Sequence, residues 1–383
     1  MPVERWQEIE NLPVESEILI EAYIPDYDDN VDTKVTSTVG DYDTLLRKAY
    51  EMCGLPYEEV IAVKSSSWVP TGRVTAFDTR TNSYIPIRGV RIRGTHLLKV
   101  KETLTDYNGR FELPSFKNPV NLKIVWESDE WDIREGEFGQ VSFDGPKLDN
   151  SAWLINIGQE HEKNIRYAAM HRAAYRYYHD NVNGLARPAN TRKEKLCFFD
   201  SHKQKKSGDY ASNLTLGILP DIRVWSKYED GSYYGTDIIF NITAHELGHA
   251  SHCTWMSTVQ FLQVKNYITE SWADFVEWAV SDIEYRALGS SSSAYRHQDW
   301  IGGSDYTPLF IDLVDTYNQS LYDSSRPNDQ ISGYEYNVLN VLLFDTYGLA
   351  SLKSNLKLWK PNTVTDEQID TFLAKYEELL END

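Results

Sequence analysis

The spacing of apolar residues changes twice along the chain and predicts three regions. Residues 1–66 are mixed. An apolar run, Ile18–Ile24, is followed by an acidic loop at residues 26–32 and by a predicted helix, Asp43–Cys53, which ends just before Gly54. The acidic loop lacks the glycine and the final glutamate of an EF-hand, so we interpret it as a solvated turn. The pattern assigns no role to this first region.

From residue 67 to residue 149 the apolar period becomes two. Val74 and Ala76, and further on Leu122 and Ile124, alternate with polar residues in short runs. Glycines and an Asn-Gly pair separate these runs, and Asn-Gly suits a tight hairpin because it tolerates positive φ. This region is therefore predicted to form an antiparallel β-sandwich.

Residues 150–383 show helical periodicity with a few strand-like runs. Two short runs of apolar residues predict strands at Lys195–Phe199 and Asp221–Trp225. The fold class is therefore multidomain α+β: a sandwich followed by a mostly helical domain with a small sheet. The predicted helices are Glu160–Asp180, Ile238–Thr254, Thr269–Leu288, Pro308–Asn318, Tyr334–Tyr347 and Asp366–Leu380.

Charge and cysteine content exclude several classes of function. The 383 residues include 38 Lys and Arg against 58 Asp and Glu, a net charge of -20, which argues against nucleic acid and anionic membranes as partners. The 3 cysteines have no CxxC spacing, so neither a thiolate metal site nor a disulfide framework is expected. No apolar stretch is long enough to predict a membrane-spanning segment.

The chemistry-bearing motif is HELGH at residues 245–249, inside one of the predicted helices. His245 and His249 are four residues apart, so both imidazoles lie on one face of the helix and can reach one metal ion. Glu246 projects toward the same place, where it can accept a proton from a water molecule. The alternative is a pair of core histidines satisfied by ordinary hydrogen bonds.

A second acidic pattern in the next predicted helix favours the metal. Two histidines need a third protein ligand to form a catalytic zinc site with an open position for water. Glu270 follows His249 by 21 residues, and Asp274 lies one turn further along the same helix face. Glu270 is the expected third ligand, with Asp274 as the alternative.

The pattern differs from the extended metzincin motif. That motif requires glycine at 252 and histidine at 255, where this chain has His252 and Trp255. His252 lies one turn beyond His249 and could line the site. We expect it to be a buried structural histidine instead.

The HExxH motif at residues 245–249, followed by an ExxxD motif at residues 270–274, resembles the signature of the gluzincin metallopeptidases, the thermolysin-like and aminopeptidase-like group. The resemblance implies that His245, His249 and Glu270 bind Zn2+, that Glu246 is the general base, and that Asp274 orients the first histidine. It also implies an oxyanion donor, a tyrosine or histidine well beyond the glutamate ligand, which falls here between Tyr334 and Tyr336, with His297 as another candidate.

The β-rich region resembles the carboxypeptidase regulatory-like domain, a small sandwich that is accessory and extracellular. This implies a secreted or cell-surface bacterial protein whose leader precedes this sequence. The residues that carry the resemblance are Gly72, Val74, Gly89, Val90, Thr105, Asp106, Gly109 and Phe111.

Together these features predict a zinc metallopeptidase that acts on a peptide or protein substrate. Zinc would lower the pKa of a bound water to about 7, and Glu246 would take its proton. The substrate would pair with an edge strand, for which Asp221–Trp225 is the candidate. The alternative from another class is a surface protein- or glycan-binding module with a structural or vestigial zinc site. A further alternative keeps the zinc chemistry on a non-peptide amide or ester.

Overall fold

The computed structural model describes residue 48 and residues 67–189, 192–211, 221–291, 305–321 and 323–380. The chain divides into two units, residues 1–64 and 65–383, and every helix and strand named below belongs to the second. The predictions for Ile18–Ile24, for the acidic loop at 26–32 and for Asp43–Cys53 apart from Lys48 therefore lie outside the described residues, as does His297.

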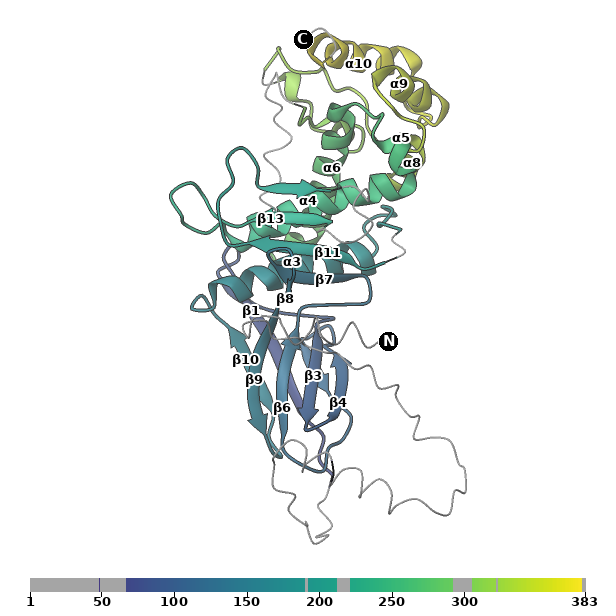
Figure 1. The fold of residues 1–383 in the computed structure, drawn as a ribbon. Helices are drawn as coiled ribbons and strands as arrows, with labels where there is room; N and C mark the ends of the chain where they lie inside the picture. The colour runs from purple at the N-terminus through teal and green to yellow at the C-terminus, as the bar shows by residue number, and fades with distance from the viewer. Residues whose placement is uncertain are drawn as a thin grey trace, which may run out of the picture. The chain divides into compact units, whose positions relative to one another are not determined.

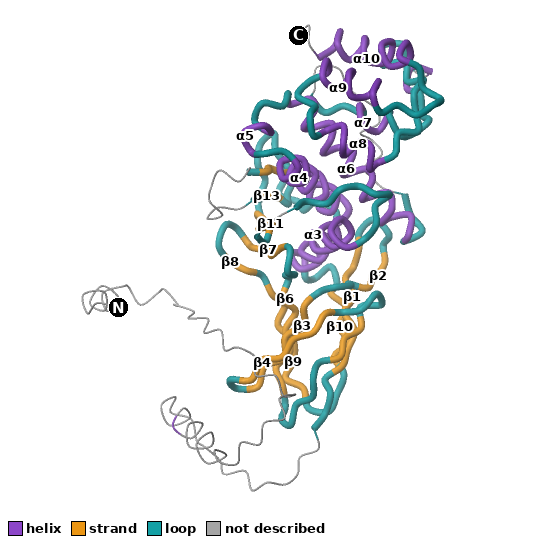
Figure 2. Tube along the Cα trace, turned by 90° about the vertical axis from the view of Figure 1, so that its right-hand side faces the viewer, coloured by secondary structure: helices purple, strands orange, loops and turns teal. Residues whose placement is uncertain are grey.

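Two four-stranded sheets form from the region of alternating apolar residues (Figures 1 and 2). Their inward side chains, among them Val74, Ile92 and Ile124, are fully buried in a common core. Strand β10 runs parallel to β1, so the arrangement is not purely antiparallel as expected. One sheet contains β10 (Trp153–Ile157), β1 (Thr71–Asp78), β2 (Ser83–Pro86) and β5 (Arg110–Glu112), and the other β4 (Lys99–Leu104), β3 (Arg91–His96), β6 (Val120–Val125) and β9 (Ser142–Leu148).

The predicted tight turn at Asn108-Gly109 is present. Asp106 Oδ1 accepts hydrogen bonds from the backbone N–H groups of Asn108 and Arg110, both at 2.8 Å. Gly109 has φ 73°, and a Cβ there would lie 2.3 Å from the carbonyl oxygen of Val74. The turn therefore needs glycine both for its backbone conformation and for its close approach to β1.

A third sheet crosses the predicted boundary at residues 149 and 150. β7 and β8 come from the region predicted as a sandwich, but they belong to this third sheet, where β7 runs parallel to β11. Conversely, β10 comes from the region predicted as helical, but it pairs with β1 of the sandwich. The boundary is corrected accordingly, because alternation identifies a strand but not its partner. The strand order is β12 (Gly208–Tyr210), β13 (Ile222–Trp225), β11 (Glu194–Phe199), β7 (Trp131–Glu135) and β8 (Gly139–Gln140).

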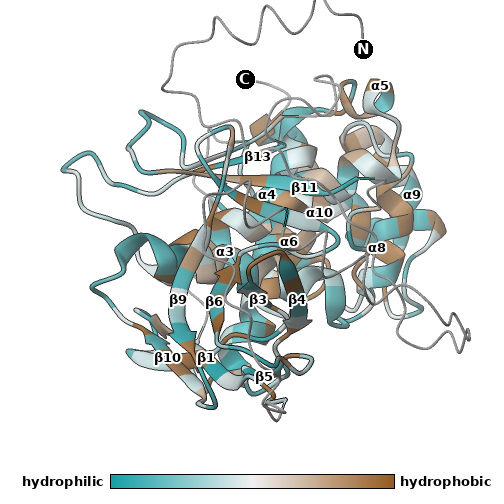
Figure 3. Ribbon diagram, turned by 60° about the horizontal axis from the view of Figure 1, so that its bottom comes forward, coloured by the Kyte–Doolittle hydropathy of each residue, from teal (hydrophilic) through white to brown (hydrophobic). Residues whose placement is uncertain are grey.

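The helices confirm a mixed α+β chain. The expected helix Pro308–Asn318 is a single turn, and the expected Tyr334–Tyr347 is shorter and is followed by an unpredicted helix after Gly348. In Figure 3 hydrophobic and hydrophilic positions alternate along α8 and α9, as expected for helices with one buried face. The helices are α3 (Glu162–His179), α4 (Thr236–Trp255), α5 (Thr258–Phe261), α6 (Asn266–Ala287), α7 (Leu309–Asp312), α8 (Tyr336–Leu343), α9 (Leu349–Leu358) and α10 (Asp366–Leu380). Within the described ranges, no helix combines the length and apolar composition needed to cross a bilayer.

Helix α4 is the central element of the helical part, packed against α3, α6 and the strands β12 and β13. At Gly248 a Cβ would lie 2.9 Å from Cα of Ala273, so only glycine lets α4 and α6 approach this closely. This close packing brings side chains of α6 within reach of those on α4.

A buried ion network holds the start of α4 to the end of β1. Asp78 is fully buried and accepts hydrogen bonds from Arg172 of α3 at 2.8 Å and from Thr236 Oγ1 at 3.1 Å. Arg172 also donates to Glu284 of α6 at 2.9 Å. Backbone and side chain of Thr236 exchange two 2.8 Å hydrogen bonds with Thr79. β1, α3, α4 and α6 therefore meet at one polar junction.

Candidate metal centre

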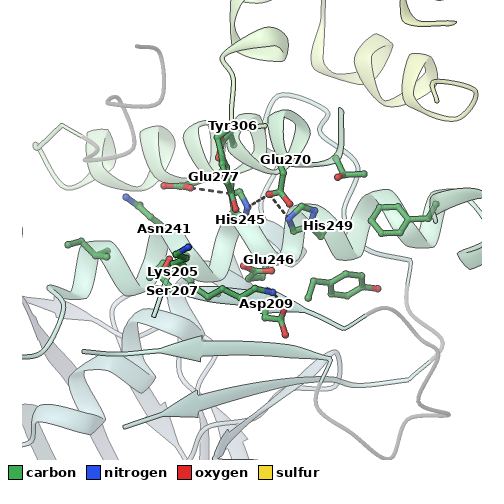
Figure 4. A pocket seen from close by; sticks show the side chains of 18 residues that line it. Lys205, Ser207, Asp209, Asn241, His245, Glu246, His249, Glu270, Glu277 and Tyr306 are labelled. Carbon is green, nitrogen blue, oxygen red and sulfur yellow. Dashed lines mark hydrogen bonds and ion pairs between the residues drawn. The ribbon is translucent and has the colours of Figure 1, made fainter. Parts of the chain in front are cut away.

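Helices α4 and α6 bring the three predicted ligands together (Figure 4). Nε2 of His245 and Nε2 of His249 each lie 3.2 Å from Oε2 of Glu270. The ligand atoms of these three residues all lie within 4.8 Å of one another. The histidines are one helical turn apart on α4, and Glu270 lies in the second turn of α6, three residues before Ala273, which packs against Gly248.

The distances from Glu270 to the two histidines fit a zinc ion. With zinc–ligand bonds of about 2.0–2.1 Å, two ligand atoms of a tetrahedron are separated by about 3.3 Å. Two His–Glu separations of 3.2 Å match that value. The donors, two imidazole nitrogens and one carboxylate oxygen, are those of a catalytic zinc site that keeps a position open.

The charges around His245 also favour a cation. Burial alone would lower the pKa of His245, but hydrogen bonds to Asp274, Glu270 and Glu277 outweigh it and raise the pKa well above the usual 6.5. Similarly, burial would raise the pKa of Glu270, but the two histidines hold it well below its usual value. Carboxylates thus outnumber imidazoles here, and a positive charge is stabilised between them.

Asp274 occupies the predicted orienting position. Its Oδ1 lies 3.1 Å from Nδ1 of His245, on the ring edge opposite Glu270, so Glu270 and not Asp274 faces both histidines. Glu277 adds a second carboxylate, 3.5 Å from the same Nδ1. The sequence interpretation missed Glu277, although residues 270, 274 and 277 follow the spacing of one helix face.

Glu246 faces the same cavity, which has a volume of about 530 Å³. The side chain is 5% exposed, and burial raises its pKa to about 7 despite the opposing charges of the two histidines. Gly208 of β12 lies directly against the Glu246 carboxyl group: a Cβ at position 208 would be only 2.1 Å from Oε1 of Glu246. Gly208 was not predicted as a site residue, and no pattern around it distinguishes it from other strand glycines.

The edge strand beside the cavity is β12, and the expectation of Asp221–Trp225 is corrected. β13 lies inside the sheet, between β12 and β11. The backbone carbonyl of Ser207 accepts a hydrogen bond from the N–H of Trp225, and the N–H of Ala211 donates one to the carbonyl of Asp221. The backbone groups of residues 207 and 211 therefore face β13. By antiparallel alternation, the N–H and C=O groups of Gly208 and Tyr210 are directed away from β13.

Tyr334 and Tyr336 do not lie at the cavity. The Tyr334 side chain is buried, and its hydroxyl donates to the backbone carbonyl of Leu356 at 3.2 Å. Tyr336 packs edge-on against Phe275, with ring centroids 4.9 Å apart. Two other tyrosines line the cavity. Tyr210 stacks on His249, with ring centroids 6.4 Å apart, and Tyr306 lies beside His245, with ring centroids 5.9 Å apart. Spacing along the sequence could not identify Tyr306, because it lies outside the helices and strands, just before α7.

His252 has the structural position that the sequence interpretation favoured. It is 1% exposed and packs edge-on against Phe261 and Trp272, with ring centroids 5.2 and 6.5 Å away. Burial lowers its pKa to about 3, so it is neutral at ordinary pH. It does not line the cavity.

Comparisons with known proteins leave the function to be argued from this geometry. No family model matches the chain, and no curated protein matches it. One similar solved structure is a 9R-lipoxygenase from Cyanothece, with 10% identity over 57% of this chain and 27% of that chain, at a TM-score of 0.15. A TM-score this low carries no argument about fold or activity.

Proposed function

We propose that this protein is a zinc-dependent peptidase, similar in its site to the gluzincins. One observation carries the proposal: ligand atoms of His245, His249 and Glu270 lie within 4.8 Å of one another, with the buried carboxyl group of Glu246 in the same cavity. Bound zinc would polarise the scissile carbonyl and lower the pKa of water to about 7.

The chain's own residues supply the remaining chemistry. Glu246 is placed to accept the proton of the attacking water and to pass it to the leaving amine. Asp274 and Glu277 hold the His245 ring so that Nε2 faces the metal position. An extended peptide can pair with the outward N–H and C=O groups of Gly208 and Tyr210, which would favour a peptide over a small amide or ester.

Tyr306 is the proposed donor to the developing oxyanion. It lines the cavity on the His245 side, and burial raises its pKa to about 12, so its hydroxyl keeps a proton to donate. Because one oxyanion donor contributes about 10²-fold or more to kcat, Tyr306→Phe should lower kcat by about that factor with little change in KM. The measurement is steady-state hydrolysis of a cleaved peptide. Tyr334→Phe, the same change away from the cavity, is the control and should keep wild-type kcat, whereas equal activity of both variants would remove Tyr306 from this role.

Metal content and peptide hydrolysis test the proposal directly. The purified protein should carry zinc by elemental analysis and should cleave members of a mixed peptide library. Removing the metal with a chelator should abolish cleavage, and adding zinc back should restore it. Protein without zinc, or cleavage that persists after the metal is removed, would contradict the proposal.

A further inference from the structure

Three acidic side chains cluster between α7 and α8, away from the candidate zinc centre. Asp312 ends α7, Asp315 follows it, and Asp329 lies in the loop that leads to α8. One oxygen from each lies within 4.8 Å of the others. Asp312 is fully buried and Asp329 is only 6% exposed, so these carboxylates are not a solvated surface patch.

Within the described residues, no lysine or arginine contacts Asp312 or Asp329. Asp312 accepts neutral hydrogen bonds from Gln319 at 2.7 Å and from Tyr376 of α10 at 2.8 Å. Burial raises the pKa of Asp312, and burial together with the Asp312 charge raises that of Asp329. Ionising both carboxyl groups here would therefore place negative charge in the interior without a balancing side chain on these two residues.

One oxygen of Asp329 points to a missing ligand. Oδ1 accepts the backbone N–H of Ile331 at 3.2 Å, but Oδ2 is buried and has no hydrogen-bond partner among the described residues. A buried carboxylate oxygen left without a partner is costly, and native proteins rarely keep one. The site thus offers an oxygen ligand that no described side chain or backbone group uses.

We propose that Asp312, Asp315 and Asp329 bind a calcium ion. The three donors are all carboxylate oxygens, which hard cations prefer, whereas zinc prefers the nitrogen and sulfur donors of the other centre. Calcium also tolerates irregular ligand geometry and takes several carboxylates at once, unlike magnesium, which keeps most of its water. A bound cation would stabilise the ionised form of these carboxyl groups and give Oδ2 of Asp329 the partner that it lacks among the described residues.

The ion would brace the segment that carries Tyr306. The hydroxyl of Thr307, just before α7, forms a 2.6 Å hydrogen bond with the hydroxyl of Ser271 on α6. Ser271 is the residue that follows Glu270. At the other end, Asp312 is held by Tyr376 of α10. Calcium would therefore tie the end of α7 to the loop before α8, and Tyr376 would link Asp312 of this site to α10.

Calcium binding to the zinc-loaded protein tests this inference. Titration with calcium chloride up to about 10 mM should show one bound equivalent, and saturating calcium should raise the Tm by about 3 °C or more. Asp329→Asn removes the charge but keeps the shape, so this variant should bind no calcium and should be at least as stable as wild type without it. Asp315→Asn, at a half-buried position, should also lose binding.

Asp323→Asn is the matched control, because Asp323 lies in the same segment but its side chain is 51% exposed. It should bind calcium like wild type. The inference is overturned if the wild-type protein binds no calcium, or if Asp329→Asn and Asp315→Asn both bind it as wild type does. An equal response to magnesium chloride would overturn the assignment to calcium. None of these outcomes depends on zinc or on peptide cleavage.

Discussion

Replacing Glu246 with glutamine should lower kcat for peptide hydrolysis by about 10³-fold while zinc stays bound. The amide keeps the size of the carboxyl group that lies against Gly208, so the packing is preserved. It cannot accept a proton from water, however. The three ligands on α4 and α6 are unchanged, and zinc content by elemental analysis should equal that of wild type.

Glu229→Gln provides the control for this experiment, because it makes the same change at an exposed position in the turn before α4. It should leave kcat and zinc content unchanged. Wild-type kcat in Glu246→Gln would rule out the base role. Loss of zinc from Glu246→Gln would instead mean that the Glu246 carboxyl group helps to hold the metal. The fall in kcat would then no longer be evidence that Glu246 is the base.

The second large effect is on folding, at the junction of β1 with the helices. Asp78→Ala should lower the free energy of unfolding by about 3–5 kcal/mol, because it leaves the buried guanidinium of Arg172 with one acidic partner fewer. Urea unfolding followed by tryptophan fluorescence measures the change. Because Asp78 also accepts a hydrogen bond from Thr236 at the start of α4, the loss should be cooperative across the helical part.

Asp370→Ala is the matched control, since Asp370 pairs with Lys357 on the surface at 2.7 Å. Solvent-exposed pairs of this kind contribute about 0–1 kcal/mol. Equal stability of Asp78→Ala and the control would show that the buried network does not hold the fold together.

The effect of Asp78 should depend on pH with a definite sign. Burial alone would raise its pKa, but Arg172 and the hydrogen bonds from Thr81 and Thr236 hold the pKa below the usual 3.8. A carboxyl group with a lowered folded-state pKa stabilises the protein above its unfolded-state pKa and loses that contribution as the pH falls. The difference between wild type and Asp78→Ala should therefore be full at neutral pH and should narrow below about pH 4.

Much of the candidate centre could be predicted from the sequence because its geometry is local. His245, Glu246 and His249 lie within one helical turn, and Glu270, Asp274 and Glu277 follow the same rule on the next long helix. Helix periodicity predicts their relative directions without any tertiary information. The need for a third zinc ligand then selects Glu270.

The parts that were missed depend on contacts between distant segments. β7 lies before the predicted boundary but pairs with β11, and β10 lies after it but pairs with β1. Apolar alternation does not identify a strand's partner. Gly208 meets Glu246 only because β12 forms the edge of the sheet next to α4. Tyr306 lies outside the helices and strands, just before α7, so no sequence period indicates its direction.

The sequence by itself determined the α+β class, the long helices α3, α4, α6 and α10, and five side chains of the candidate centre on α4 and α6, namely His245, Glu246, His249, Glu270 and Asp274. These follow from periodicity and from helix geometry, which act over a few residues. Tertiary structure alone decided which strand borders the cavity, which tyrosines line it, and that Asp312 and Asp329 are buried together. Those outcomes depend on the packing of segments far apart in the chain, and local spacing contains no information about such contacts.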